Sequence, residues 1–282
     1  MGAPGEPHLL VVVEGDRPIG VAPLALQGAC AHFLGSHEVC DYQDLVVAPG
    51  KGRHVLAAVM EHLRHRGITQ LDFRTLRPDA VTVEALKSLA PKQMETALAP
   101  DEVTFEMALP DTWDGYLQLL DGKQRHEVRR KLRRLETHGA WTYSVIESSN
   151  GLGKASHAFV DLFRRNRADK AEFMSGAMVD YFQDLMEALA SHGLLRLCFL
   201  DVDQHAVAAV LCFDYAGVRY LYNSGYDEQY EPLSVGILSK VLSIQHAVGM
   251  GCRRYDFLKG REIYKKRIGG QPVDLYRCRM TI

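Results

Sequence analysis

Two segments of this chain share the same spacing of glycine, aspartate and phenylalanine. Residues 67–73 align without a gap to residues 251–257, which lie 184 positions further along the sequence. Two turn-like pairs, Gly-Asp at 15–16 and Val-Asp at 202–203, match at a nearby offset of 187 positions. Because the same kinds of element are expected between the matched segments in both copies, the sequence predicts an internal duplication of one structural unit.

Each copy is predicted to contain three strands, a loop, a helix and a fourth strand. Apolar, β-branched stretches predict the strands, and apolar residues at i, i+3 and i+4 predict the helices. In the first copy these are strands at 8–13, 18–26, 31–34 and 68–76, with a helix that buries Val55, Ala58, Val59 and Leu63 and ends at Gly67. In the second copy they are strands at 195–200, 206–213, 218–222 and 254–258, with a helix that buries Ile237, Leu238, Val241 and Leu242.

The two copies are expected to be separated near Pro110, which gives halves of 1–110 and 111–282. Residues 111–138 are expected to be helical, with leucines and a valine at heptad-like spacing, and two more helices are predicted at 155–167 and 179–190. The expected fold class is therefore α/β (α+β), with two similar halves, each a mixed, mostly antiparallel sheet flanked by helices.

Composition narrows the class of protein further. The net charge of −2 argues against a protein whose whole surface binds nucleic acid. Residues 1–110 carry a charge of −5 and residues 111–282 a charge of +3, so a polyanionic partner would favour the second half. The six cysteines form no C-x-x-C pair and are expected to be reduced thiols. No apolar run approaches the roughly 20 residues of a membrane helix, and cytoplasmic localisation is expected.

The start of the helix in the second copy is a candidate anion site. Ser234 is placed to cap this helix, and Gly236 would let the backbone approach a ligand closely. The free N–H groups and the positive dipole end of a helix N-terminus favour phosphate. Upstream, residues 223–227 end a strand with small and polar side chains, and a glycine there suggests a bulge that frees main-chain groups. Plain capping and an ordinary loop are the alternative interpretations.

Two further segments concentrate ionisable groups. Residues 259–267 follow a predicted strand, at the edge where ligands of open α/β sheets usually bind. A tyrosine in this segment could give up a proton and a lysine could hold an oxyanion. Residues 123–134 carry seven basic groups and one acid, with Arg125, Arg129 and Arg133 on one helical face. The alternatives are a solvated basic helix start for the first segment and a solvated helix face for the second.

Other catalytic motifs are absent from the sequence. It contains no G-x-G-x-x-G, P-loop, H-E-x-x-H or G-x-S-x-G pattern. His62 and His65 are three residues apart on a predicted helix, a spacing that is more typical of a polar helix face than of metal ligands. No metal site is expected.

Several of these segments in combination resemble the CelD-like acetyltransferases. These are tandem GNAT-fold proteins of bacterial cellulose and exopolysaccharide operons, related in fold to the FemAB-like peptidyltransferases. The resemblance covers nearly the whole chain and rests on five segments: Asp41–Asp44, Asp121–Arg125 with Arg129–Glu136, Leu221–Asp227, Ser234–Gly236 and Tyr255–Lys265.

The resemblance implies two GNAT-like halves and an acyl-CoA site, with acetyl-CoA as the expected donor, on the second half. The pyrophosphate would sit on the N–H groups of Val235, Gly236 and Ile237, after Ser234, and the pantetheine would run along the strand that ends at Tyr226. The residues near the point of acyl transfer would be Asp256, Tyr264 and Lys265. Two departures stand out: Val235 replaces a frequent proline, and the first half lacks the leading helices of a GNAT fold and is N-terminally shortened.

The sequence is thus expected to encode an acyltransferase that moves an acyl group from CoA to an amine or hydroxyl, on a sugar or cell-envelope precursor, by direct attack. Asp227 or Asp256 would deprotonate or orient the acceptor, and Tyr264 would protonate the departing thiolate. One alternative is FemAB-like transfer from an aminoacyl-tRNA, with residues 123–134 on phosphates; nucleic acid is expected as a partner only in this case. Another is a binding or scaffold protein whose donor site has decayed.

Overall fold

The structure is a computed structural model that describes residues 5–36, 38–90, 92, 97–165, 172–174 and 176–282. It divides into two compact units, unit 1 with Met1–Thr104 and Val273–Ile282, and unit 2 with Phe105–Pro272. The expected division near Pro110 lies close to the first of these boundaries. In contrast to the expected ranges, the C-terminal residues from Val273 onward belong to unit 1.

Unit 1 contains a sheet on which the helices α1 and α2 pack. The strand order is β1-β2-β3-β5-β12-β6, with β4 paired to β2; β1, β2 and β3 are antiparallel, and β3 and β5 are parallel. Helices and strands share one apolar core that includes Leu24, Leu56, Phe73 and Leu86. The elements are β1 (Glu6–Glu14), β2 (Arg17–Gln27), β3 (Cys30–Phe33), β4 (Val46–Val47), α1 (Gly52–His65), β5 (Gln70–Leu76), α2 (Val81–Leu89), β6 (Leu98–Ala108) and β12 (Gln271–Thr281), of which the last two strands continue into unit 2.

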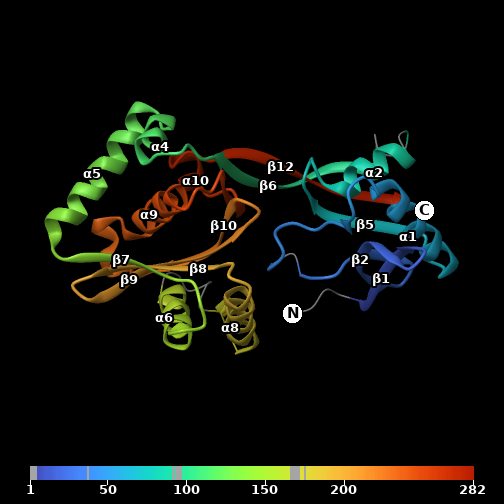
Figure 1. The fold of residues 1–282 in the computed structure, drawn as a ribbon, viewed down its shortest axis with the longest axis horizontal. Coiled ribbons are helices and arrows are strands. Elements are labelled where there is room, and N and C mark those ends of the chain that lie inside the picture. The colour runs from blue at the N-terminus through green and yellow to red at the C-terminus, as the bar shows by residue number, and fades with distance from the viewer. Residues whose placement is uncertain (1–4, 37, 91, 93–96, 166–171, 175) are drawn as a thin grey trace. The chain divides into compact units, whose positions relative to one another are not determined.

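Unit 2 contains a sheet with helices on both faces. Its strand order is β7-β8-β9-β10-β11-β6. Figure 1 shows α6 and α8 on one face of β8 and β9, with α5 and α9 on the other, and a separate apolar core lies on each face. The elements are α4 (Trp113–Leu119), α5 (Gly122–His138), β7 (Trp141–Ile146), α6 (Leu152–Arg165), α8 (Gly176–Ser191), β8 (Leu195–Val202), β9 (His205–Tyr215), β10 (Val218–Tyr226), the 3-10 helix η1 (Glu228–Leu233), α9 (Val235–Gly249), β11 (Arg254–Lys259) and α10 (Ile263–Arg267).

The predicted duplication is confirmed by the pairing of the strands. In unit 1, two antiparallel pairs, β1·β2 and β2·β3, are followed by helix α1 and the parallel pair β3·β5. In unit 2, β8·β9 and β9·β10 are followed by α9 and the parallel pair β10·β11. Asp72 and Asp256 are each the third residue of the last strand, β5 or β11. In each unit, an aspartate therefore occupies the equivalent position of the strand that pairs in parallel after the helix.

The stretch expected to be helical at 111–138 is helical and is divided into two helices, α4 and α5. Leu120 has an extended backbone (ψ 142°), and Asp121 begins α5 by accepting a hydrogen bond from the N–H of Gln124 at 2.8 Å. An aspartate N-cap satisfies a donor that would otherwise be free, which explains why a new helix starts at this residue. No helix formed by the described residues is long and apolar enough to cross a membrane.

Candidate functional site

Strands β10 and β11 run together for three residues and then part. Their parallel pairs are Val218–Arg254, Arg219–Tyr255 and Tyr220–Asp256, and no later pair follows among the described residues. Strand β10 nevertheless continues to Tyr226, held on its other side by β9. Among the described residues, β10 therefore has no strand partner on the side of β11 beyond Tyr220.

The backbone of β10 is irregular near the point where the strands part. The register against β9 shifts between Leu221 and Asn223, and the N–H of Ser224 donates to Oδ1 of Asn223 at 2.9 Å. The sequence interpretation attributed this irregularity to Gly225. Gly225 instead serves the packing of α6, because a Cβ atom at this position would overlap the backbone of Phe163.

The turn from η1 into α9 leaves two backbone N–H groups unused. Ser234 has a left-handed backbone (φ 59°), and its carbonyl oxygen accepts from the N–H of Ile237 at 3.0 Å and of Leu238 at 2.9 Å. Within the described part of the chain, the N–H groups of Val235 and Gly236 have no acceptor. The side chain of Ser234 does not cap the helix, in contrast to the sequence expectation. Two N–H groups, and not the three expected, therefore remain at the helix start.

A buried lysine connects the start of α9 to Tyr264. The Lys240 side chain is 5% exposed, and its Nζ donates to the carbonyl oxygen of Gly236 at 2.8 Å. The same Nζ lies 5.0 Å from the centre of the Tyr264 ring, a cation–π distance. On the other side, a Cβ atom on Gly236 would come within 2.8 Å of the Tyr226 ring. Tyr226, Gly236, Lys240 and Tyr264 therefore form one contiguous group.

The hydroxyl of Tyr264 is protonated at neutral pH, as a tyrosine with its ordinary pKa near 10 is. Burial raises the pKa of this hydroxyl, and the nearby charge of Glu262 raises that pKa further. The phenol therefore keeps its proton over a wider pH range than an exposed tyrosine.

Asp256 and Lys265 hold the end of β11 and the residue that follows it. Asp256 is completely buried, and its Oδ1 accepts from the N–H of Leu258, a residue with a left-handed backbone (φ 56°), at 2.8 Å. Lys265 is 2% exposed; its Nζ donates to the carbonyl oxygens of Leu258, Lys259 and Gly260 at 3.0, 2.7 and 3.3 Å. It also lies 3.0 Å from Oε2 of Glu262. An ammonium has three N–H donors, so the geometry of Lys265 is that of a structural anchor.

Asp227 lies at the other end of the η1 turn. Its Oδ1 accepts from the N–H of Gln229 at 3.0 Å, and its Oδ2 is 3.5 Å from Nη1 of Arg165 at the end of α6. Its side chain is 17% exposed. Asp227 thus joins the η1 turn to α6, and neither of these polar contacts involves Asp256, Tyr264 or Lys265.

A family comparison agrees with this geometry. Residues 122–266, just over half of the chain, match the family model described as an acetyltransferase (GNAT) domain. The chain belongs to this family. The matched range contains α9, β10, β11 and the residues described above, so the separated strands and the helix start belong to the GNAT domain. No curated protein sequence matches the chain.

Solved structures with low sequence identity share the fold of this GNAT protein. FemX has a TM-score of 0.64 and 12% identity, with 96% of this chain and 88% of that chain covered. L-PGS from Bacillus licheniformis has a TM-score of 0.62 and 11% identity over 96% and 83% of the two chains. A tandem GNAT protein from the clavulanic acid biosynthesis pathway has a TM-score of 0.50 and 14% identity over 99% and 84%. At these identities the likeness concerns the fold alone.

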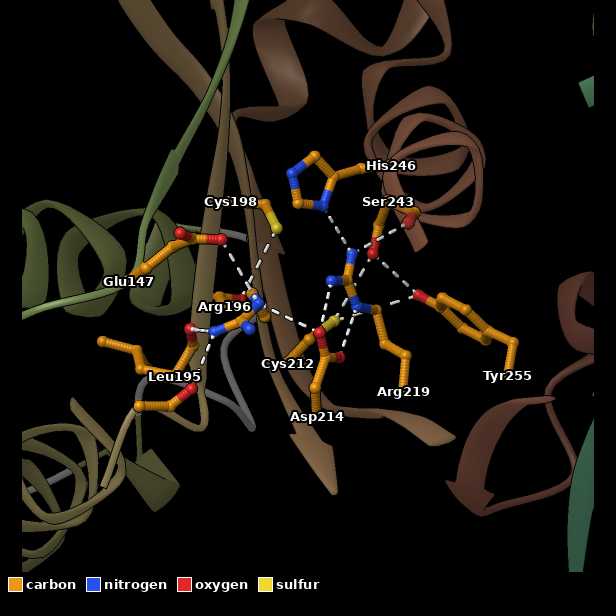
Figure 2. Close-up of polar contacts among 11 residues, drawn as sticks. Glu147, Leu195, Arg196, Cys198, Cys212, Asp214, Arg219, Ser243, His246 and Tyr255 are labelled. Atoms are coloured by element: carbon orange, nitrogen blue, oxygen red, sulfur yellow. Dashed lines mark hydrogen bonds and ion pairs between the residues drawn. The ribbon is translucent and has the colours of Figure 1, made fainter. Parts of the chain in front are cut away.

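Sequence reasoning missed the buried arginine that supports this part of the GNAT domain. Arg219 on β10 has no exposed surface, and it donates to both carboxylate oxygens of Asp214 on β9 at 2.7 Å (Figure 2). Its Nη1 also donates to the carbonyl of Ser243 at 3.2 Å and to Nδ1 of His246 at 2.9 Å, both on α9. One guanidinium therefore joins β9, β10 and α9. A charged residue between apolar neighbours in a predicted strand was the only sequence signal.

The cluster extends to four more side chains: Arg196, Ser243, Tyr255 and Cys212. Figure 2 shows Arg196, whose Nε is 2.9 Å from Oδ2 of Asp214. On the side of α9, the hydroxyls of Ser243 and Tyr255 are 3.0 Å apart, and Sγ of Cys212 lies 3.5 Å from the Ser243 hydroxyl. Burial raises the pKa of Tyr255. These residues have partners within the interior and give rigidity to the sheet behind the helix start.

The basic helix α5 packs against η1. The predicted buried stripe is confirmed, since Val128 and Leu135 are buried and Leu132 packs partly buried against the same core. Arg129 and Arg133 are exposed. Nη1 of Arg134 donates to the carbonyl oxygen of Pro232 at 2.7 Å, two residues before Ser234. Basic side chains thus lie close to the turn that precedes α9.

Proposed function

We propose that this GNAT domain transfers an acyl group, with acetyl as the first candidate, from acyl-CoA to an amine or hydroxyl acceptor. One observation carries the proposal: β10 and β11 part beside a helix whose first two N–H groups have no acceptor in the described chain. Backbone donors at a helix start favour phosphate, and an open strand edge offers hydrogen bonds to an extended amide chain.

The residues at the helix start fit the phosphate part of acyl-CoA. Val235 and Gly236 would hold the pyrophosphate through charge-assisted hydrogen bonds, each worth about 1.5 to 3 kcal/mol. Ile237 already donates to Ser234 and would contribute through the helix dipole only. The pantetheine would follow the side of β10 from which β11 has parted, towards Tyr226. The bound donor would supply an acyl group activated as a thioester.

Proton transfer in this proposal depends on Tyr264. Its hydroxyl carries a proton at neutral pH, as a tyrosine with its ordinary pKa near 10 does, and burial raises that pKa further. It would give this proton to the leaving sulfur. The buried carboxylate of Asp256 would orient or deprotonate the acceptor, and Asp227 is the second carboxylate available for this role. Lys265 would act by holding the turn at 258–260, and not by contact with the reacting groups.

The acceptor is proposed to be a small molecule, a sugar or a cell-envelope precursor. This proposal rests on the resemblance to the CelD-like acetyltransferases, whose operons make cellulose and exopolysaccharides.

Transfer from an aminoacyl-tRNA, as in FemAB-like proteins, is the second candidate function. Its supporting observation is α5, where Arg129 and Arg133 are exposed and Arg134 contacts the turn before α9. Contacts between this helix and phosphates would make binding strongly dependent on salt.

Calorimetric titration of the full chain distinguishes these functions. Acyl-CoA dependence is supported if acetyl-CoA binds saturably and tRNA does not bind at 150 mM salt. Salt-dependent binding of tRNA without binding of acetyl-CoA contradicts it and favours the second candidate. Binding of neither would point to a domain whose donor site has decayed.

A further inference from the structure

Strand β1 forms one edge of the sheet in unit 1. It stands first in the strand order, and among the described residues it has a strand partner only on the side of β2. Its nine residues follow one another without an extra residue, because the register shift after Val12 is taken up by Ile19 on β2. β1 is therefore a long, regular edge strand, of the kind that readily pairs with a strand of another chain.

The face of β1 that points away from α1 is apolar and exposed. Leu9, Val11 and Val13 alternate along this face. Val11 lies opposite Val21 of β2, and Val21 lies opposite Val46 of β4. All three valines are exposed, and they form one row across three strands. Contiguous apolar side chains of this kind mark a surface that contacts another molecule.

The other face of β1 packs on the core and carries polar groups at both ends. Leu10 and Val12 lie against the apolar core. His8 precedes them and stacks on His62 of α1, and Glu14 follows them at the end of the strand. One end of this face therefore offers an imidazole ring and the other end a carboxylate.

We propose that unit 1 pairs with a second copy of this chain through β1, with the two strands antiparallel and a two-fold axis at Val11. An axis perpendicular to the sheet keeps the apolar faces of both copies on the same side. Leu9 then lies opposite the partner's Val13, and Val11 lies opposite the partner's Val11. The row of valines continues from one copy into the other, and β-branched side chains on neighbouring strands pack favourably.

Charge excludes the neighbouring registers of such a pair. With the axis at Leu10, Glu6 would lie directly opposite the partner's Glu14 at both ends, and like charges in this position are destabilising. This register would also bring Pro7, which has no N–H group, into the paired segment. With the axis at Val12, Glu14 would lie opposite an apolar leucine.

The register centred on Val11 instead matches the polar ends. The partner's Glu14 lies opposite His8, whose neutral ring has one N–H to donate. The charge of Arg66 acts on the same ring, so this end of the strand attracts a carboxylate. Glu14 already accepts from Lys51 within its own copy, and a carboxylate has room for a further donor. These contacts at the rim set the register and add little affinity.

The size of the paired segment predicts a weak dimer. Residues 8–14 supply seven residues from each copy, whereas a standard interface uses roughly 20 to 30 residues on each side. The untagged full chain should therefore change from monomer to dimer with concentration. Sedimentation velocity over about 1 to 200 µM protein measures this change.

Substitutions at position 11 test the register. Val11→Lys should weaken the dimer about tenfold or more, because it places two like charges directly opposite each other on the two-fold axis. Val11→Glu should do the same. An equimolar mixture of the two variants should form a dimer again, since a lysine then faces a glutamate. Val11 is 59% exposed, so both variants are expected to fold, and rescue in the mixture would show that they do.

Val46→Lys is the matched control. Val46 is exposed on the same apolar face but lies on β4, away from the edge, so this variant should form dimers like the wild type. Loss of the dimer in Val46→Lys would mean that the copies pack face to face, and it would overturn the proposal. A wild type that stays monomeric, an unchanged dimer in Val11→Lys, or a mixture that stays monomeric would each overturn it as well.

Discussion

Arg219 and Asp214 are joined by two hydrogen bonds of 2.7 Å each, between a guanidinium with no exposed surface and a carboxylate that is 15% exposed. The pair lies on neighbouring strands, and Arg219 also reaches two groups of α9. The start of α9 is the proposed phosphate site, so the position of this site depends on a buried charge pair behind it.

Removal of the carboxylate should strongly destabilise unit 2. Asp214→Asn leaves the Arg219 guanidinium buried without a full counter-charge, and loss of one partner of a buried pair costs about 3 to 5 kcal/mol. Urea unfolding measures this change. Glu14→Gln, which breaks the exposed pair with Lys51, serves as the control and should change the midpoint little. A similar midpoint shift in both variants would show that burial of the pair is unimportant.

The contact between Arg219 and His246 predicts a pH dependence. Burial lowers the pKa of His246, and the charge of Arg219 lowers it further. As the pH falls through the unfolded value of about 6.5, the unfolded chain takes up this proton first. The free energy of unfolding should therefore fall between pH 7.5 and pH 5.5.

His246→Gln isolates the contribution of this histidine. Glutamine can still accept a hydrogen bond from Arg219 but does not titrate, so the variant should lose less stability over the same pH interval. Unfolding free energies at the two pH values give the comparison. Equal losses in the variant and the wild type would assign the pH dependence to other groups.

Gly225 should not tolerate even one methyl group. In Gly225→Ala, the new Cβ overlaps the backbone of Phe163, and overpacking of this kind costs about 1 to 3 kcal/mol. Gly153 lies on α6, the helix that contains Phe163, and a Cβ atom at this position meets no atom within 4 Å. Gly153→Ala should therefore leave stability unchanged or raise it, because alanine favours helices. Thermal unfolding of both variants checks the prediction; equal stability would mean that α6 can shift.

The sequence predicts most of the repeated unit but not the strands at its margins. Periodicity within one segment is sufficient for the hairpins, for α9 and for the buried stripe of α5. Strands β6 and β12 were not predicted, because β12 pairs with β5, which lies about two hundred residues earlier in the chain, and local patterns carry no information about distant partners.

At the candidate site, sequence patterns likewise do not give the backbone conformation of single residues. The sequence indicated the correct helix start, but it could not show that Ser234 takes a left-handed backbone. Lys265 was expected near the reacting groups. Its ammonium donates hydrogen bonds to three carbonyl oxygens. The left-handed backbone of Leu258 helps to orient these oxygens towards the ammonium. Backbone direction of this kind is a property of the folded chain.

A side chain at position 236 should interfere with acetyl-CoA. In Gly236→Ala, the Cβ comes within 2.8 Å of the Tyr226 ring, so the ring must move at the end of β10, where the pantetheine is proposed to lie. Acetyl-CoA affinity should fall about tenfold or more, which is roughly 1.4 kcal/mol, and Gly236→Leu should reduce it further. Gly249→Ala at the far end of α9 has free space and is the control. Unchanged affinity in both Gly236 variants would move the donor site elsewhere.

Tyr264→Phe should separate binding from turnover. The ring and its contact with Lys240 are retained, so acetyl-CoA affinity measured by calorimetry should stay close to that of the wild type. The variant lacks the proton that the leaving thiolate needs, and general acid catalysis typically contributes about a hundredfold or more to rate. CoA release, followed with a thiol reagent, should fall accordingly. Tyr181→Phe removes a hydroxyl from an exposed tyrosine on α8 and should not alter the rate. Wild-type turnover in Tyr264→Phe would exclude this hydroxyl as the acid and leave Lys240, a buried cation 5.0 Å from the Tyr264 ring, as the next candidate.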